Sequence, residues 1–381
     1  MTVIQKRPDN PVAHLTEADI ETIRQELDAI RKEVFASLGE EEAAYIRNMI
    51  KTQRTLELGS RAILLFSLFP PAWLIGTAGL SLAKILENME IGHNIMHGQW
   101  DWMRDPAIHS STWEWDNASP ADQWKHSHNE IHHQFTNVVG KDNDLGYGVM
   151  RVDEDQAWRP EILLQPLWNF LVMCLFEYAV AIHDLDLARV SRGKAPADEE
   201  FKGKGRAILR KVRRQMRKDY LIHPLLSGPS APTTLAANAV ANLVRNVWTH
   251  SVIMCGHFPE GVATFSKTSI EGETKGEWYI RQMVGAANIS GAPLFHVMTG
   301  NLSFQIEHHI YPDMPSIRYQ EISPRIKELF ERYDLPYVTG PFHKQLASAW
   351  LKVIRLSLPN SIAGHKYPEV DAPVVPEAVA A

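Results

Sequence analysis

The most chemically distinctive residues of this sequence are its seventeen histidines, many of which fall in three short segments. The segment HNIMH at 93–97 holds two imidazoles four residues apart, and HSHNEIHH at 126–133 holds four. The segment QIEHH at 305–309 adds two more after a glutamine. Residues three or four positions apart share one helix face, so each segment can present several imidazoles to one point. Imidazole binds Fe, Zn, Cu and Ni, so the pattern indicates a metal site without choosing the metal.

The number of histidines favours two metal ions in one shared site. A single zinc ion takes three or four protein ligands, and catalytic zinc leaves one position open. The three segments hold more imidazoles than one such ion can use. A zinc peptidase is not supported, because HExxH is absent and Glu130 is displaced within HNEIHH. The sequence also lacks a GxGxxG dinucleotide fingerprint and a P-loop.

Four apolar stretches predict the helices that position these segments. They cover about residues 56–69, 72–90, 162–183 and 233–257. A bilayer core about 30 Å thick needs about 20 apolar residues per helix, so we interpret them as transmembrane helices. Pro70 and Pro71 should turn the first two into a hairpin. A soluble protein with buried helices is the alternative, since the first stretch is short and the fourth contains Arg245.

The fourth stretch carries a polar face. Asn238, Asn242, Asn246 and His250 repeat every four residues, and His257 falls on the same side. Uncharged polar groups within a membrane span usually face the interior of the helix bundle, where they find partners. We therefore expect this face to be buried.

The connection at 202–218 predicts the orientation in the membrane, because it contains nine Lys or Arg and no acid. The positive-inside rule places it in the cytoplasm, and four spans then place both termini there too. The expected cytoplasmic segments are 91–160, 184–232 and 258–345. The basic connection is expected to form a helix on an anionic membrane surface, with a solvated charge run as the alternative.

The expected fold is all-α: an integral membrane protein with four transmembrane helices and a cytoplasmic helical cap that carries a di-metal site. Residues 1–54 form N-terminal amphipathic helices, 55–345 the membrane domain, and 346–381 a C-terminal segment with a disordered tail. Cys174 and Cys255 lie in apolar segments, which argues against a disulfide framework. A net charge of -6 gives no support to nucleic-acid binding.

The histidine segments, with their flanks, resemble the three histidine boxes of the membrane-bound fatty acid desaturases. The matching stretches are EIGHNIMHGQWDW, WKHSHNEIHHQFTN and NLSFQIEHHIYPDMPSIRY, and the resemblance covers residues 55–335. The glutamine that opens the third box is similar to the front-end, linoleoyl-CoA desaturase-like branch. The resemblance implies a non-haem di-iron centre on the cytoplasmic side. It also implies O2-dependent, two-electron insertion of a double bond into a long acyl chain, carried by CoA or by a lipid.

The resemblance also assigns roles to individual residues. The implied metal ligands are His93, His97, His128, His132, His133, His257, His308 and His309. His250 is a rival of His257 for the position at the end of the fourth stretch, and Gln305 could bind iron directly or through water. Other candidates for ligands or for groups that orient the imidazoles are His126, Asn246, Glu87, Glu90, Asp142, Asp144 and Glu307.

Electrons should come from a separate protein, since no HPGG haem motif precedes the spans. A ferredoxin, or a cytochrome b5 with its reductase, is expected. Arg210, Arg213, Arg214 and Arg217 are expected to dock that donor or the phosphates of an acyl-CoA.

Two other functions stay open on sequence grounds. A lipid or alkane hydroxylase would use the same boxes, because both reactions begin with removal of a hydrogen atom. A non-catalytic metal-binding membrane protein or transporter is disfavoured, since transporter ligands lie near the middle of the spans and these lie at their ends. Regiochemistry, chain length and the carrier of the acyl chain are not encoded in any motif that we find.

Overall fold

The protein is mostly helical, as predicted. The computed structural model describes residues 11–363 except for Asn143, Val149, Asp155, Asp186, 188–189, 191–195 and Ala197, so most of the predicted tail lies outside the described residues. Within the described part, the sheet structure is one parallel pair of three-residue strands, β1 (Asn288–Ser290) and β2 (Thr339–Pro341).

The chain begins with a capped helix followed by a helical hairpin. Thr16 and Asp19 form a capping box at the start of α1 (Glu17–Ser37). The hairpin consists of α2 (Glu40–Leu64) and α3 (Pro70–Leu86), and α3 starts with its two prolines in the first turn. The helix α2 runs without a break from Glu40 to Leu64 and so includes residues on both sides of the predicted boundary between 54 and 55.

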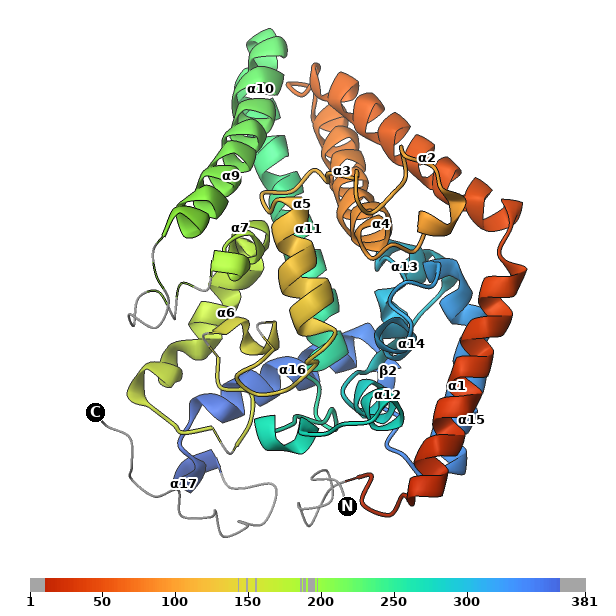
Figure 1. Ribbon diagram of the computed structural model, residues 1–381. Coiled ribbons are helices and arrows are strands. Elements are labelled where there is room, and N and C mark those ends of the chain that lie inside the picture. Colours follow the sequence, from red (N-terminus) through yellow and green to blue (C-terminus); the bar gives the residue numbers. More distant parts are fainter. Residues whose placement is uncertain are drawn as a thin grey trace.

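A second hairpin stands beside the first (Figure 1). Its first arm is α9 (Glu199–Met216), which continues through a π-helical segment, Arg217–Ile222, into α10 (His223–Leu226). Its second arm is α11 (Ala231–His257), which matches the predicted stretch 233–257. The hairpin ends meet where Ser67 Oγ lies 2.8 Å from the hydroxyls of Thr233 and Thr234. The arm that we expected to be a surface connection is therefore the partner of α11.

The stretch at 162–183 does not form the single helix that we predicted. It is divided into α6 (Gln165–Cys174) and α7 (Phe176–Ala181), bent at Leu175 by 93°. Asn246 explains the break, because its amide donates to the Cys174 carbonyl (2.9 Å) and its oxygen accepts from the Glu177 amide (3.4 Å). The Asn246 side chain thus bonds a carbonyl and an N–H group that would bond each other's neighbours within a continuous helix.

The length and apolarity of a membrane span are found in no single helix of the described residues. They are found only in a bent pair, Pro160–Cys174 with Phe176–Leu185.

The remaining helices form a cap below the hairpins. They are α4 (Asn94–Met96), α5 (Ala121–Lys125), α12 (Lys275–Val284), α13 (Pro293–Met298), α14 (Gln305–Ile310), α15 (Tyr319–Arg332), α16 (Phe342–Ser357) and α17 (Asn360–Ala363). The largest core joins α1, α12, α14 and α15, and α1 and α15 lie side by side in Figure 1. Ile23 and Leu27 of α1 pack into this core together with Ile306 and Ile310 of α14. The third histidine segment is therefore held from outside by the amphipathic N-terminal helix.

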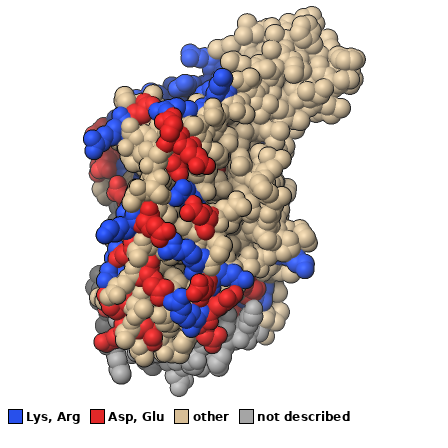
Figure 2. All heavy atoms as spheres, turned by 90° about the vertical axis from the view of Figure 1, so that its right-hand side faces the viewer, with Lys and Arg blue, Asp and Glu red and all other residues tan. Residues whose placement is uncertain are grey.

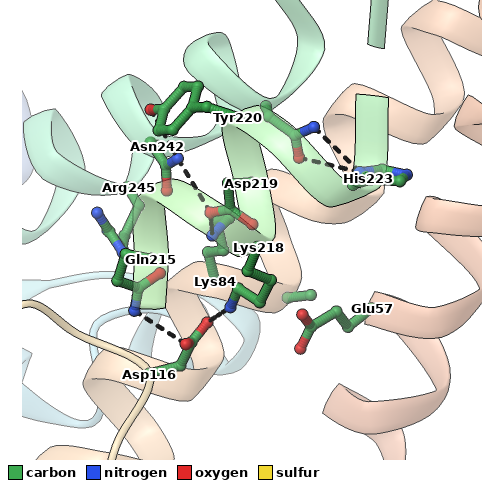
Figure 3. Close-up of polar contacts among 12 residues, drawn as sticks. Glu57, Lys84, Asp116, Gln215, Lys218, Asp219, Tyr220, His223, Asn242 and Arg245 are labelled. Carbon is green, nitrogen blue, oxygen red and sulfur yellow. Dashed lines mark hydrogen bonds and ion pairs between the residues drawn. The ribbon is translucent and has the colours of Figure 1, made fainter. Parts of the chain in front are cut away.

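Buried ion pairs join the two hairpins (Figure 3). Asp219 accepts from Lys84 Nζ at 2.7 Å and from Arg61 Nη2 at 2.9 Å. Asn242 Nδ2 lies 3.2 Å from the same carboxylate, while Lys218 pairs with Asp116. The polar face predicted for the fourth stretch is thus buried, and its asparagines contact the neighbouring helices.

Candidate metal centre

The three histidine segments and the end of α11 converge on one point. His93 and His97 follow α3, where the helix widens into a π-helical turn at Glu87–His93. The second segment forms a similar turn, His126–His132, and the third is α14. Such π-helical turns often mark functional sites, because they shift side chains out of the regular helical register.

The imidazoles form two groups. In the first, ring nitrogens of His93, His97, His128 and His308 all lie within 4.8 Å of one another. In the second, the same holds for His132, His257 and His309.

His133 lies between the two groups. Its ring centroid is 4.7 Å from that of His97 and 4.8 Å from that of His308, on the side of the first group. It is 4.5 Å from His309, in the second group. The structure therefore brings together all eight residues that we predicted as ligands.

Several nitrogens in this cluster have no protein partner. Within the described residues, the Nε2 atoms of His97, His128 and His308 and both ring nitrogens of His133 are buried without a hydrogen bond. The Nε2 atoms of His257 and His309 face each other at 3.2 Å. A buried polar atom without a partner is costly, so this arrangement fits bound cations.

Groups outside the cluster orient the imidazoles. Asp144 Oδ2 lies 2.9 Å from His128 Nδ1, and Asp142 Oδ1 lies 2.9 Å from His132 Nδ1. Asp142 is fixed in turn, since it accepts from the backbone N–H of Asn137 at 2.8 Å. A proton held on Nδ1 leaves Nε2 with its lone pair free for a metal.

Three of the predicted orienting carboxylates have other partners. Glu87 pairs with Arg54, Glu307 accepts from Asn288, and Glu90 accepts from Tyr45, Asn301 and Ser316. Sequence proximity to the histidines was misleading here, because neighbours on a helix point in different directions.

Asn94 and Thr136, which lie close to the histidines in the sequence, were not predicted as orienting groups: Asn94 Oδ1 lies 2.9 Å from His93 Nδ1, and Thr136 Oγ1 lies 3.2 Å from His309 Nδ1. Two more distant groups also escaped the sequence analysis. Gln282 of α12 presents its Oε1 3.2 Å from His309 Nδ1, and the Tyr319 hydroxyl lies 3.3 Å from His308 Nδ1. Neither residue has a sequence signal, since each reaches the site only through the packing of α12 and α15 on α14.

The other candidate residues separate clearly. Gln305 belongs to the cluster, with its Nε2 3.0 Å from His257 Nε2 and 3.2 Å from His309 Nε2. His250 lies outside it and bonds Asn169 Oδ1 at 3.0 Å, which favours His257 over His250 as the ligand from α11. His126 is half-exposed and pairs with Asp184. Asn246 lies at the α6–α7 break.

Burial sets the charge of the imidazoles. Removal from water, followed by the neighbouring imidazoles, lowers the pKa of His97, His133, His308 and His309 well below its usual value. These rings are therefore neutral at pH 7, which is the form that binds a metal. The pKa of His132 is raised, since burial opposes the charged ring but is outweighed by the Asp142 and Asp144 carboxylates.

A narrow cavity opens beside the histidines, and the centre of a water molecule has about 60 Å³ of free space in it. Its lining includes His128, His132 and Gln305, together with apolar side chains. The apolar residues are Met89, Trp115, Trp124, Phe176, Val180, Ile253 and Leu302. Polar side chains such as Asn117 and Glu177 also line it, and its apolar wall beside the histidines suits a hydrocarbon chain.

Comparison with known proteins agrees with this geometry. The model of the fatty acid desaturase family matches residues 68–341. The NADPH-dependent stearoyl-CoA 9-desaturase of Mycobacterium tuberculosis (strain H37Rv) is 49% identical over 91% of this chain and 82% of its own length. The sn-1 linoleoyl-lipid 6-desaturase of Synechocystis sp. is 22% identical over 74% of this chain and 81% of its own length. No solved structure matches the chain. The family match and the 49% identity show that the chain belongs to the fatty acid desaturase family and is an enzyme that desaturates fatty acyl chains.

Proposed function

We propose that the chain is an O2-dependent acyl-CoA desaturase that holds two non-haem iron ions in its two histidine groups. The carrying observation is the set of buried, unpartnered imidazole nitrogens against an apolar cavity. Bound iron would supply the activation of O2 that removal of hydrogen from an unactivated methylene requires. Neutral nitrogen ligands suit iron in this role.

The chain's own residues bind and orient in this mechanism. Trp115, Phe176 and Ile253 hold the acyl chain and exclude water from the reacting carbons. Asp142 and Asp144 keep protons on the Nδ1 atoms of His132 and His128, so that both rings face the metal. No side chain needs to act as a base, since a methylene C–H is not acidic.

The nature of the substrate is inferred from the relatives. The relative at 49% identity over 91% of this chain is named for stearoyl-CoA, whereas the Synechocystis relative, named for a linoleoyl lipid, is 22% identical over 74% of it. This difference favours a long-chain CoA thioester here. The NADPH in the first name supports a separate electron donor that NADPH reduces through a reductase, such as a ferredoxin or a cytochrome b5.

We further infer that both hairpins enter the membrane, with the metal centre on the cytoplasmic side. Large apolar side chains are exposed at the hairpin ends, including Phe66 (70%), Phe69 (64%), Leu225 (68%) and Leu226 (73%). Figure 2 supports this inference. In this view Lys, Arg, Asp and Glu lie mostly on the left-hand and lower parts of the surface, whereas the part that projects at the top of the molecule shows no charged side chain. The spans would be α2, α3, the α10 end of the second hairpin's first arm, and α11, with α9 and its basic residues below them on the cytoplasmic side.

The test is expression in a host of known fatty-acid profile, with the new double bond located by mass spectrometry. Purified protein should contain two iron atoms per chain. His309→Ala should abolish the product while the protein stays in the membrane fraction, and the matched variant His126→Ala should retain it. A hydroxylated product, or one iron atom or none per chain, would overturn the proposal.

A further inference from the structure

The short helix α6 has its polar residues inside and its apolar residues outside, the reverse of a helix on a water-exposed surface. It contains no charged side chain, and its buried residues are Gln165 and Asn169. Large apolar side chains of α6, of the 3₁₀ turn before it (Pro160–Leu164) and of the bend after it are 39–53% exposed: Leu163, Leu164, Leu167, Trp168, Phe170, Leu171 and Leu175. An apolar patch of this extent is expected to contact a membrane or another protein.

The two buried amides of α6 bond to neighbouring parts of the protein. Gln165 Nε2 donates to the Val353 carbonyl of α16 at 2.6 Å, and its Oε1 accepts from the Arg151 backbone N–H at 2.8 Å. Asn169 Oδ1 lies 3.0 Å from His250 Nε2 of α11. Uncharged polar groups of helices in a bilayer turn to protein partners in this way, because lipid chains offer them none. The pattern therefore favours lipid on the outer face of α6.

The outer face of α6 continues the apolar surface of the second hairpin. Leu243 of α11 is 45% exposed, and Asn246, three residues further along, bonds the Cys174 carbonyl at the end of α6. At its N-terminal end α6 meets α16, where Leu351 and Ile354 are 65% and 47% exposed. One apolar surface thus runs from α11 across α6 to α16.

The length of α6 does not allow it to cross a bilayer. Its ten residues rise about 15 Å at about 1.5 Å per residue, whereas a hydrocarbon core is about 30 Å thick. The chain then bends by 93° into α7, where Phe176 and Glu177 are buried in the protein. A helix of this length can enter one leaflet and must then turn back.

The histidine cluster also argues against a crossing at this point. Ring nitrogens of His132, which precedes α6, and of His257, which follows it, lie within 4.8 Å in one group. Between them the second hairpin leaves the side of the histidines and returns to it. One more crossing, in α6 and α7, would place His132 and His257 on opposite faces of the membrane. Both ends of the α6–α7 segment must therefore lie on one side.

We propose that α6 is a re-entrant helix, which enters the cytoplasmic leaflet from the side of the histidines and leaves it on the same side. Its partner is the acyl-chain region of that leaflet, and the exposed residues of α16 lie at the headgroup boundary beside it. The inference rests on the proposed placement of the hairpins in the membrane. It places α7, whose Phe176 and Val180 line the cavity, next to the leaflet.

The first measurement is the accessibility of a nitroxide label on Leu171→Cys in vesicles of phosphatidylcholine and phosphatidylglycerol. The variant also carries Cys174→Ser, and Cys255 is fully buried. Electron paramagnetic resonance compares collisions of the label with O2, which partitions into lipid, and with a water-soluble nickel chelate. We expect high O2 and low nickel accessibility, at a depth of about 5–10 Å into the boundary between headgroups and acyl chains. High nickel accessibility would show water, and low accessibility to both reagents would show a second copy of the chain. Either result would overturn the proposal.

Two further labels distinguish failure of this proposal from failure of the membrane placement. Leu243→Cys reports on the second hairpin, and Glu328→Cys, at a position where the side chain is 67% exposed on the cap, is the reference for water. If the label at Leu243 meets lipid and the label at Leu171 meets water, the hairpins enter the membrane and only the proposal for α6 is wrong. If the label at Leu243 meets water, the membrane placement is wrong, and the proposal for α6 with it.

The second measurement tests on which side the two ends of the segment lie. Arg159, before α6, and Lys202, after α7, are 60% and 56% exposed, and neither lines the cavity. In sealed vesicles of known orientation, a membrane-impermeant maleimide should label Arg159→Cys and Lys202→Cys from the cytoplasmic side only. Both variants should keep the turnover of the unchanged protein, which shows that they fold. Labelling of the two positions from opposite sides would show that the segment crosses the membrane and would overturn the proposal.

Discussion

Two buried polar clusters of this protein, the histidine cluster and the ion pairs between the two hairpins, differ in whether their polar atoms have hydrogen-bond partners. In the histidine cluster, ring nitrogens of His97, His133 and His308 are buried with no hydrogen bond among the described residues. In the cluster between the hairpins, Lys84 and Asp219 are equally buried but contact each other at 2.7 Å. Both clusters are therefore buried, but only the cluster between the hairpins pairs these side chains with protein partners.

The difference separates an architectural cluster from a functional one. Charges removed from water are tolerated when they are paired, as Asp219 is with Lys84 and Arg61. The neutral imidazoles of the histidine cluster face one another without hydrogen-bond donors between them. A bound cation would accept their free lone pairs. We therefore expect changes in the first cluster to affect metal and activity, and changes in the second to affect folding.

The largest expected effect follows replacement of His133 by Ala. This ring lies between the two histidine groups, so its loss removes a ligand at the position where they meet. Desaturation of stearoyl-CoA should fall below detection, and iron content should drop below two atoms per chain. Full activity in this variant would show that the two groups do not act as one centre.

A smaller loss is expected for Asp142→Asn. The variant keeps an oxygen near His132 Nδ1 but removes the negative charge that strengthens this hydrogen bond. Activity or iron affinity should fall by about 10- to 100-fold, as for other groups that orient metal ligands. Glu307→Gln is the matched control, since this buried carboxylate accepts from Asn288 and has no hydrogen bond to an imidazole of the described residues. Equal losses in both variants would assign the effect of Asp142 to packing.

The histidine positions could be predicted because metal ligands are a local pattern. Spacings of three and four residues in QIEHH and HNIMH place imidazoles on one helix face whatever the tertiary fold. The groups that orient them are only partly local: Asp142 lies ten residues from His132, but others come from distant helices. Gln282 lies 27 residues from His309, so only the packing of α12 on α14 brings the two together. Composition and periodicity carry no trace of such a contact.

For the helix hairpins, by contrast, the local sequence pattern gave wrong predictions. The stretch at 162–183 has the apolar length of a span, yet Asn246 of another helix interrupts it. The basic segment at 202–218 has the composition of a surface loop, yet it continues into the arm that pairs with α11. Lys211 and Lys218 of this segment pair with Glu114 and Asp116, and the next residue, Asp219, pairs with Lys84 on the first hairpin. A cationic segment could enter the bundle because its counter-charges come from elsewhere in the chain.

The second cluster is tested by Lys84→Met, which leaves the Asp219 carboxylate buried with one partner fewer. Breaking a buried ion pair on one side costs about 3–5 kcal/mol, so thermal unfolding in detergent should move to a clearly lower temperature. Iron content per folded chain should stay at two. Arg325→Ala, which removes an exposed pair with Glu33, should cost at most about 1 kcal/mol. An unchanged midpoint for Lys84→Met would mean that the buried pair does not hold the hairpins together.

The smallest expected effect concerns the fit of Gln305 into the second histidine group. Gly256, next to His257, leaves room for this side chain, since a Cβ at Gly256 would lie 2.8 Å from Gln305 Cγ. Gly256→Ala should therefore push the amide away from His257 and His309 and lower kcat, with both iron atoms retained. The matched change is Gly59→Ala, because a Cβ at Gly59 meets no atom within 4 Å. Gln305→Ala should reproduce the loss of Gly256→Ala, and the two changes combined should add little, because both act through one amide. If the losses of kcat in the two single variants add fully in the double variant, Gly256→Ala acts by another route, such as a shift of the α11 backbone.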